Sequence, residues 1–214
     1  MRLDEFSRDT RYTAHVLASE RLTPENSEAE IRHLVFRVEK AGFSFEVGQN
    51  IGIIVPGPHG YGHRQHFRLY SIANEPGADM QVEICVKRCF SIDEISGERH
   101  PGIASNYLCD RVAGDRIEVT GPYGQAFETP DDDEADLLMI GLGTGIAPFR
   151  AFVKHLYRSR GGWRGRVRLF YGAKSGLEVP YLNDELDDFA QYYDRGTFKA
   201  FAALSPRPHM DDPV

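Results

Sequence analysis

The chain has 214 residues, of which 41% are hydrophobic and 27% are charged, and its formal net charge is −7. This balance is typical of a globular protein with one large or two small domains, and the negative charge argues against a broad nucleic-acid binder, whose surface must be basic. The longest apolar runs, such as residues 137–140, are far shorter than the roughly 20 residues of a membrane-spanning helix, so we expect a cytoplasmic protein without a membrane span.

Strand patterns separated by Gly and Pro dominate the chain up to residue 102. Val82, Ile84 and Val86 alternate with Glu, Cys and Lys, and Ile117 and Val119 alternate with polar residues, which is the period-two pattern of a half-buried strand. This part favours an antiparallel barrel or sandwich. The remaining elements expected here are strands at 12–18, 31–38, 51–55 and 66–72, a loop at 56–66 and a short helix at 103–110.

After Gly121 the pattern changes. The acidic run 131–134 is typical of a solvated linker and marks a domain boundary. An apolar strand at 137–140, a Gly-rich turn and a helical pattern at 146–157 follow. Alternating strands and helices predict a parallel sheet with right-handed crossovers. We therefore expect a β-domain at 10–130 and an α/β domain at 136–214, the latter with further elements at 167–171 (strand), 182–189 (helix) and 198–204 (strand).

The cysteines and histidines do not indicate a metal site or a disulfide framework. Cys85, Cys89 and Cys109 form no C-x-x-C pair and have no histidine nearby at metal-ligand spacing. Three histidines fall in the loop at 56–66, where solvated polar residues are common. We expect no metal among the cofactors.

The Gly-rich turn at 141–148 joins an apolar strand to an amphipathic helix and contains Gly143, Thr144 and Gly145 before Pro148. Backbone N–H groups at such a helix start can face an anion, and a nucleotide pyrophosphate fits this geometry. The turn is neither a P-loop nor the G-x-G-x-x-G fingerprint. By itself it is equally well explained as a tight connection between strand and helix.

Two further segments combine phosphate-binding and stacking residues. In an extended strand, Arg68 and Tyr70 point to one face and Ser71 to the other; a guanidinium suits a phosphate and a phenol ring suits an aromatic cofactor. Gly102 permits close backbone approach, and Ser105 lies at the start of a short helix that can hold a second phosphate. Taken singly, these segments are an ordinary strand and a capped surface helix.

Together, the three segments have the order and spacing seen in plant-type ferredoxin-NADP reductases, which the chain resembles from about residue 12 to residue 204. The resemblance implies an antiparallel FAD-binding β-barrel followed by a parallel-sheet domain for the nicotinamide nucleotide. The matching segments are 47–52, 68–74, 85–88, 102–110, 121–124 and 143–150.

On the FAD side, the resemblance implies that Arg68 contacts the pyrophosphate and that Tyr70 stacks on the isoalloxazine. Ser71 would hydrogen-bond near flavin N5, so Tyr70 and Ser71 are the expected catalytic residues. Phe90 stands near the position where relatives stack a Tyr on the adenine. The phosphate cradle would be completed by Gly102, Ile103, Ala104 and Ser105.

On the nucleotide side, the resemblance implies that Lys87 lies where the two cofactors meet. The Ser-Arg pair that relatives use for the 2′-phosphate of NADP corresponds to Ser205 and Arg207, separated here by a proline. NADP(H) is the expected nucleotide, with NAD(H) as the alternative. The remaining residues expected to bind it are Gly143, Thr144, Gly145 and Pro148.

The implied activity is hydride transfer between NADP(H) and FAD, with single electrons passed to or from ferredoxin or flavodoxin. Two alternatives stay open: the reductase component of an oxygenase system, and a non-catalytic module that holds FAD for a larger complex. Arg64 and the basic stretch 158–168 are candidate docking positions for an acidic carrier. Because relatives continue past this point with another strand, we expect the chain to be part of a longer protein, its α/β domain incomplete.

Overall fold

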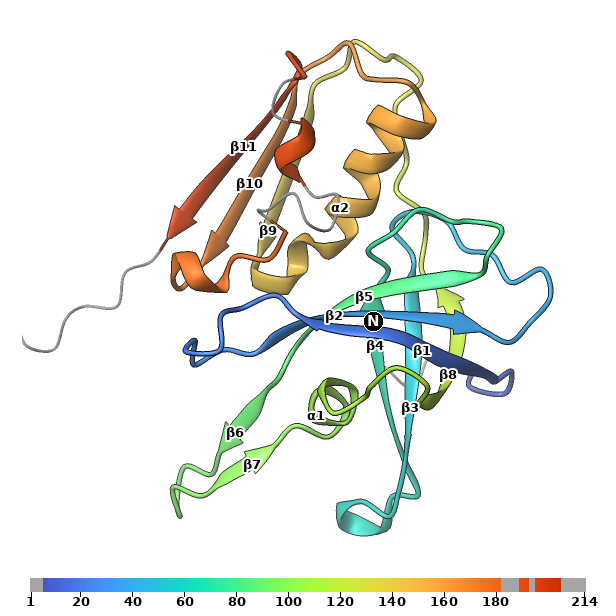
Figure 1. Cartoon of the computed structure of the whole chain (residues 1–214), viewed down its shortest axis with the longest axis vertical. Coiled ribbons are helices and arrows are strands. Elements are labelled where there is room, and N and C mark those ends of the chain that lie inside the picture. Colours follow the sequence, from blue (N-terminus) through green and yellow to red (C-terminus); the bar gives the residue numbers. More distant parts are fainter. Residues whose placement is uncertain (1–5, 182–188, 193–194, 205–214) are drawn as a thin grey trace, which may run out of the picture.

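The computed structural model describes residues 6–181, 189–192 and 195–204. Its strands form a six-stranded antiparallel sheet, a three-stranded parallel sheet and a two-stranded hairpin. The two larger sheets lie one above the other along the long axis of the molecule (Figure 1). Within the described ranges, no helix is long and apolar enough to cross a membrane.

The six-stranded sheet closes into a barrel. Its strand order is β4-β3-β8-β1-β2-β5, and the two end strands meet through a bridge between Ile72 and Ile84 and through the Ala73 N–H, which donates to the Glu83 carbonyl at 2.8 Å. The predicted antiparallel barrel is confirmed. Its strands are β1 (Tyr12–Arg21), β2 (Ile31–Val38), β3 (Asn50–Pro56), β4 (Gln65–Ser71), β5 (Gln81–Lys87) and β8 (Arg116–Tyr123).

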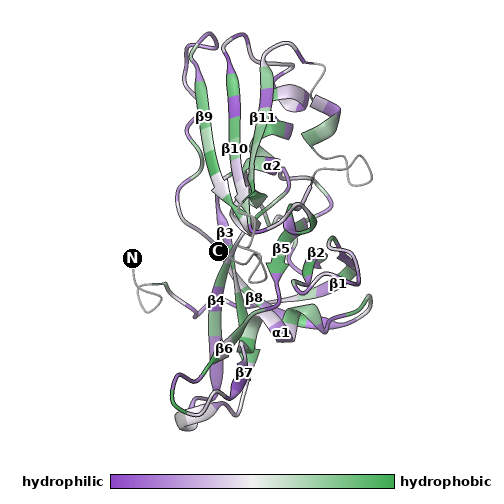
Figure 2. Cartoon of the chain, turned by 90° about the vertical axis from the view of Figure 1, so that its left-hand side faces the viewer, coloured by the Kyte–Doolittle hydropathy of each residue, from purple (hydrophilic) through white to green (hydrophobic). Residues whose placement is uncertain are grey.

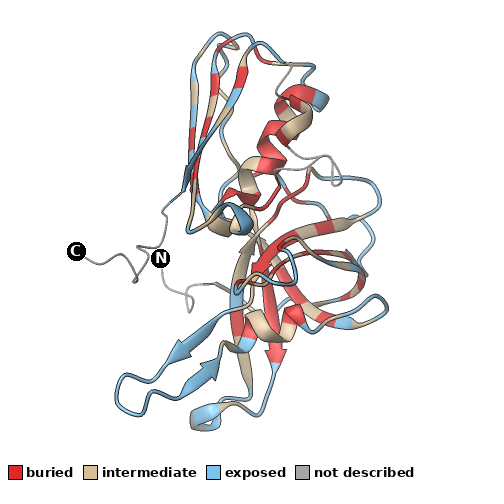
Figure 3. Cartoon of the chain, turned by 60° about the vertical axis from the view of Figure 1, so that its left-hand side comes forward, coloured by how far each residue is buried: buried red, intermediate tan, exposed pale blue. Residues whose placement is uncertain are grey.

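A short helix and an exposed hairpin extend the barrel. Helix α1 (Ile103–Cys109) buries Ala104, Leu108 and Cys109 against the barrel core, which confirms the predicted short helix. The hairpin of β6 (Phe90–Ile92) and β7 (Arg99–Pro101) is exposed along its whole length (Figure 3).

The parallel sheet has the order β11-β10-β9, and a continuous helical segment covers one of its faces. That segment consists of a 3₁₀ turn (Gly143–Ile146), α2 (Ala147–Lys154) and a π-helical turn (His155–Ser159). The predicted strands and first helix are therefore confirmed, whereas residues 182–188 of the second predicted helix lie outside the described residues. The strands are β9 (Leu137–Leu142), β10 (Val167–Ala173) and β11 (Phe198–Leu204).

The opposite face of this sheet is apolar and exposed. Leu138, Ile140 and Leu142 alternate along β9 with exposed fractions of 65%, 67% and 76%, and the rings of Phe170 and Phe201 stack with centroids 4.8 Å apart. Figure 2 views the sheet from this side, with hydrophobic, green stretches along its strands. Parallel sheets normally have both faces covered. In the described part of the chain, only the face that packs against the helical segment is covered.

The acidic linker pairs with the basic stretch at the end of the sheet where the strands begin. Arg164 lies 2.5 Å from the Asp133 carboxylate, and Arg166 pairs with Asp136. These arginines lie at the opposite end of the strands from the edge that faces the barrel. The charges of these two arginines are therefore paired with carboxylates of the same chain, whereas the docking role of Arg64 and of the stretch 158–168 stays a prediction.

A buried ion pair joins the two sheets. On α2, Arg150 is 3% exposed, and its Nη1 donates to Glu83 Oε2 on β5 at 2.6 Å and to the carbonyl oxygen of Ala73 at 2.9 Å. A buried guanidinium is tolerated only when its donors are satisfied in this way. The pair fixes α2 against the barrel.

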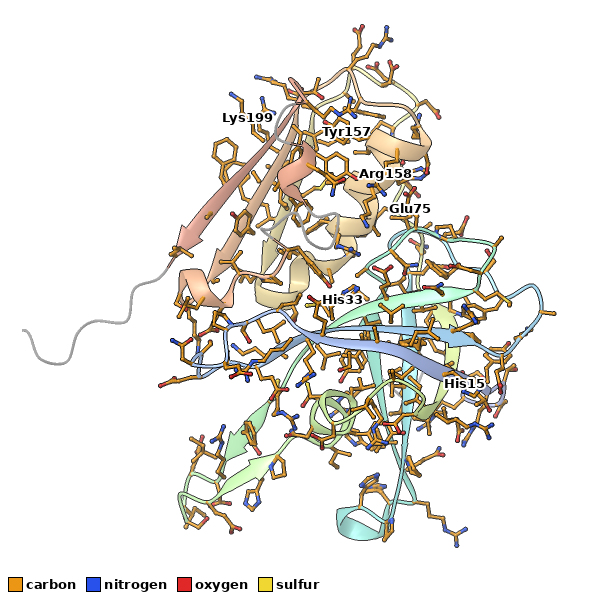
Figure 4. All side chains as sticks on the ribbon, viewed as in Figure 1. His15, His33, Glu75, Tyr157, Arg158 and Lys199 are labelled. Carbon is orange, nitrogen blue, oxygen red and sulfur yellow. The ribbon has the colours of Figure 1, made fainter. Side chains whose placement is uncertain are left out.

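His33 and Tyr181 extend this contact. His33 Nε2 lies 3.3 Å from Glu83 Oε2, and His33 Nδ1 lies 2.9 Å from the Tyr181 hydroxyl. A carboxylate only accepts hydrogen bonds, so in the neutral ring Nε2–H donates to Glu83 and Nδ1 accepts from Tyr181. Figure 4 shows His33 at the junction of the barrel and the α/β unit.

The ionised Glu83 carboxylate at this junction makes the stability of the fold depend on pH. Burial alone raises the pKa of Glu83, but the hydrogen bond from His33 and the charge of Arg150 lower it from its ordinary 4.5 to about 2. A depressed carboxyl pKa stabilises the fold above pH 4.5, and this contribution is lost as the pH falls toward 2. Removing it by Glu83→Gln should cost on the order of 3 kcal/mol at neutral pH.

Urea unfolding between neutral pH and pH 2 measures this effect. The difference between the parent and Glu83→Gln should shrink below pH 4.5, because the parent loses the carboxylate there as well. Glu94→Gln, which changes an exposed carboxylate of the hairpin, should follow the parent. Parallel profiles for the parent and Glu83→Gln would contradict the interpretation.

Candidate functional site

A cavity of about 560 Å³ lies where the carboxyl ends of the parallel strands meet the barrel. Ligands of open α/β sheets bind at this edge. The barrel contributes Ile31 and Lys87 to the lining. The α/β unit contributes the other lining residues, Leu142, Gly143, Thr144, Gly172, Ala173, Lys174, Glu178, Ala203 and Leu204.

The glycines of the turn at 141–148 have three different roles. A Cβ on Gly141 would lie 2.8 Å from Ile146 Cγ2, so this position requires close packing. Gly143 has a φ of +52°, the left-handed region that favours glycine. Gly145 does not have a φ in this region, and a Cβ built on it would meet no neighbouring atom within 4 Å. Neither packing nor backbone strain explains Gly145, which faces open space beside the cavity-lining Thr144.

Arg68, Tyr70 and Ser71 lie on β4, at one end of the barrel sheet. The Ser71 hydroxyl donates to Asn50 Oδ1 at 2.9 Å, so its oxygen keeps lone pairs for another donor. Arg68 is exposed, and its side chain donates only to the neighbouring Phe67 carbonyl among its described contacts. Burial raises the pKa of Tyr70 above its ordinary value, so the phenol stays neutral.

The start of α1 is tied to the chain that follows β5. A Cβ on Gly102 would lie 2.9 Å from Ser105 Oγ and 3.2 Å from the Cys89 carbonyl oxygen. Ser105 Oγ accepts the Cys89 N–H at 3.2 Å, while Asn106 Nδ2 donates to the Cys89 and Gly102 carbonyls at 2.8 Å. The predicted cradle is thus a rigid backbone segment, in which Ala104 is buried and Ile103 is exposed.

Arg88 organises this region, and sequence reasoning assigned it no role. It donates to Glu30 at 2.7 Å, to Asp110 at 2.8 Å and to Asn106 Oδ1 at 3.1 Å. Burial alone raises the pKa of Glu30, but hydrogen bonds from Arg88 and Arg32 bring it below its ordinary value. Its partners lie 18 to 58 residues away in sequence, so no local spacing signals the network.

Lys87 and Phe90 lie beside a second, wider groove of about 910 Å³. Lys87 Nζ donates to Glu178 Oε2 at 2.7 Å, and the Arg99 guanidinium lies over the exposed Phe90 ring at 3.6 Å from its centroid. Lys87, Lys174 and Glu178 line both the cavity and the groove.

The structure brings some of the predicted residues together. Gly143, Thr144 and Lys87 line one cavity, although they come from different sheets. Tyr70 packs against the core cluster that contains Ala104, Leu108 and Cys109 of α1, and α1 contacts β4, which places β4 beside α1 and its cradle. Gly145 and Pro148 belong to the same helical segment but do not line the cavity. Ser205 and Arg207 lie outside the described residues.

Comparisons with known proteins agree with this arrangement. A model of the oxidoreductase FAD-binding domain matches residues 22–127, and a model of the oxidoreductase NAD-binding domain matches residues 139–212. The chain is 36% identical over 205 residues to a ferredoxin–NADP reductase of Thermosynechococcus vestitus, covering 92% of the chain and 52% of that protein. It is 32% identical over 201 residues to a ferredoxin–NADP reductase of Spirulina, covering 91% of the chain and 68% of that protein.

A solved structure shows the same fold. The ferredoxin-NADP⁺ reductase from Plasmodium falciparum superposes with a TM-score of 0.73 at 24% identity, covering 96% of this chain and 74% of that one. The chain spans about half the length of several curated relatives it matches, with 52%, 46% and 44% in three cases.

The different roles of two glycines can be tested with a matched pair of variants. Gly143→Ala forces a side chain into the left-handed region and should destabilise the fold by about 1 kcal/mol. Gly145→Ala meets neither strain nor contact, so it should be neutral or stabilising by up to about 1 kcal/mol. Urea unfolding of both variants measures the difference, and equal destabilisation would contradict this assignment.

Proposed function

Because the chain belongs to the ferredoxin–NADP reductase family, we propose that it is an FAD-dependent oxidoreductase that moves a hydride between NADP(H) and FAD and single electrons to or from ferredoxin or flavodoxin. The observation that carries this proposal is the cavity lined from both sides. Lys87 approaches it from the barrel, and Gly143 and Thr144 approach it from the parallel sheet. Such a cavity suits a nucleotide held against a second cofactor.

The barrel surface fits FAD. The exposed Arg68 guanidinium would hold the pyrophosphate through paired hydrogen bonds. The half-buried Tyr70 ring offers a stacking surface for the isoalloxazine, and the absence of a side chain at Gly102 lets the α1 cradle come close to a phosphate. When bound, FAD supplies the hydride and single-electron chemistry.

On the nucleotide side, Gly143, Thr144 and Gly145 would hold the nicotinamide nucleotide at the start of the helical segment, with Pro148 in its first turn. A helix start favours anions because its N–H groups have no partners within the helix. Ser205 and Arg207 remain predictions for the 2′-phosphate. Titrations with NADPH and with NADH would test which nucleotide is preferred.

Visible spectroscopy of the purified protein, supplemented with FAD and then freed of unbound FAD by gel filtration, tests the proposal directly. Flavin bands that NADPH bleaches, followed by reoxidation on adding ferredoxin or flavodoxin, are expected. An absence of flavin bands would contradict the whole proposal. Bands that neither NADPH nor NADH bleaches would leave only a module that holds FAD.

Three further features belong to the proposal. The division into domains at 10–130 and 136–214 is supported by the two separate sheets, and limited proteolysis between them would test it. A cytoplasmic location stays a prediction, which cell fractionation would test. Arg64, exposed on the loop between β3 and β4, is the proposed contact for an acidic electron carrier.

Tyr70→Ala should weaken FAD binding several-fold, since ring stacking contributes on the order of 1 kcal/mol beyond area burial. Titration of the apoprotein with FAD measures the dissociation constant. Tyr70→Phe keeps the ring and should bind FAD like the parent. If Tyr70→Ala binds FAD as tightly as the parent, the ring is only a core residue.

Ser71→Ala should slow flavin reduction by NADPH by on the order of tenfold or more, because a single polar group at a reacting centre typically contributes that much. FAD affinity should change little, since the Ser71 hydroxyl already donates to Asn50. Single-turnover absorbance measures the rate. Ser96→Ala in the exposed hairpin is the matched control, and equal rates for Ser71→Ala and the parent would refute the assigned role.

A further inference from the structure

The ion pair between Lys87 and Glu178 crosses from the barrel to the α/β unit. Lys87 ends β5, and Glu178 ends a 3₁₀ turn (Gly176–Glu178) that follows β10. Their charged atoms are 2.7 Å apart, with side-chain exposures of 36% for Lys87 and 12% for Glu178. Because the Glu178 carboxylate is largely withdrawn from water, its attraction for Lys87 is screened less than that of a surface pair.

Tyr181 holds this turn in place. Its backbone φ of +62° lies in the left-handed region, which is unfavourable for a bulky residue. The conformation is kept because the ring is fully buried, the Arg150 guanidinium lies 4.8 Å from the ring centroid, and the hydroxyl contacts His33 at 2.9 Å. Glu178 lies three residues before Tyr181. Because Tyr181 is held in this way, the Glu178 carboxylate is kept beside Lys87.

Glu178 also controls the charge of the cavity. Of the described residues that line it, only Lys87, Lys174 and Glu178 are charged, so the lining carries a formal charge of +1 instead of the +2 of the two lysines alone. The rest of the lining is apolar, glycine or the Thr144 hydroxyl. The two lysine ammonium groups are therefore the charged groups of the lining that a phosphate can pair with.

We propose that the Glu178 carboxylate acts as an internal competitor for the phosphates of the nucleotide: it occupies Lys87 until an arriving phosphate replaces it. This inference rests on the proposed function, since it names a residue that sets nucleotide affinity at the same site. Lys87 exchanges one anionic partner for another, and Glu178 turns to Lys174 or to water. The site thereby binds its nucleotide less tightly than its two lysines allow and releases it more readily.

The decisive variant is Glu178→Gln, which keeps the shape of the side chain and removes its charge. NADP⁺ should bind roughly tenfold more tightly to this variant than to the parent. A change of this size corresponds to about the free energy of one partly buried ion pair. Calorimetric titration of the FAD-loaded protein at about 50 and about 200 mM salt measures the affinity. The salt dependence should be steeper in the variant, because the cavity gains one net positive charge.

Two further variants complete the test. Glu25→Gln makes the same charge change at the rim of the groove, outside the cavity lining, and should leave NADP⁺ affinity within about twofold of the parent, as expected for a screened surface charge. Adding Lys87→Met to Glu178→Gln should abolish the gain, since the lysine is the group released. Thermal unfolding of each variant checks that the fold is kept.

The outcomes separate this inference from the function on which it rests. Unchanged or weaker NADP⁺ binding by Glu178→Gln, in a parent protein whose flavin NADPH does bleach, would overturn the competitor role and leave the proposed function standing. A gain of equal size in Glu25→Gln would overturn it as well, because any lost carboxylate would then suffice. No NADP⁺ binding by the parent or by any variant would overturn both.

Discussion

The contact on which the rest of the structure depends is the buried pair of Arg150 and Glu83. Glu83 lies on β5, four residues before Lys87, and Arg150 lies on the helical segment that begins at Gly143. Because a strand and a helix are each stiff over such lengths, joining Arg150 to Glu83 also sets the separation between Lys87 and the Gly-rich turn. The pair thereby helps to set the form of the cavity between the two sheets.

Burying a guanidinium and a carboxylate costs more than their attraction returns unless their other hydrogen-bonding positions are filled. Here the Ala73 carbonyl takes a second Arg150 hydrogen bond and His33 donates to Glu83. His33 Nδ1 in turn accepts a hydrogen bond from the Tyr181 hydroxyl. The network is therefore satisfied across elements of both sheets, and the strained backbone at Tyr181 is tolerated because these contacts determine it.

The two halves of the candidate site are held by different sets of contacts. On the barrel, Ser71 and Asn50 face each other across paired strands, and the start of α1 is fastened by Ser105 and Asn106 to Cys89. None of these contacts involves the parallel sheet. The cavity, in contrast, needs both sheets, since Lys87 lines it from the barrel and Gly143 and Thr144 line it from the parallel-sheet unit. A change at the junction should thus disturb the cavity between the sheets before it disturbs the β4 and α1 segments of the barrel.

By itself, the sequence determined the elements and the motifs that a local pattern encodes: β2 and β11 end where the periodicity predicts, and the Gly-rich turn and the Arg68–Ser71 segment are recognisable because their residues lie close together along the chain. Only the tertiary structure decided the pairings. Arg150 meets Glu83 across 67 residues and Lys87 meets Glu178 across 91, and two arginines of the basic stretch, Arg164 and Arg166, pair with Asp133 and Asp136. The reason is physical: periodicity reports which face of an element is buried, whereas the partner of a buried charge is set by how two elements pack, which no spacing along the chain encodes.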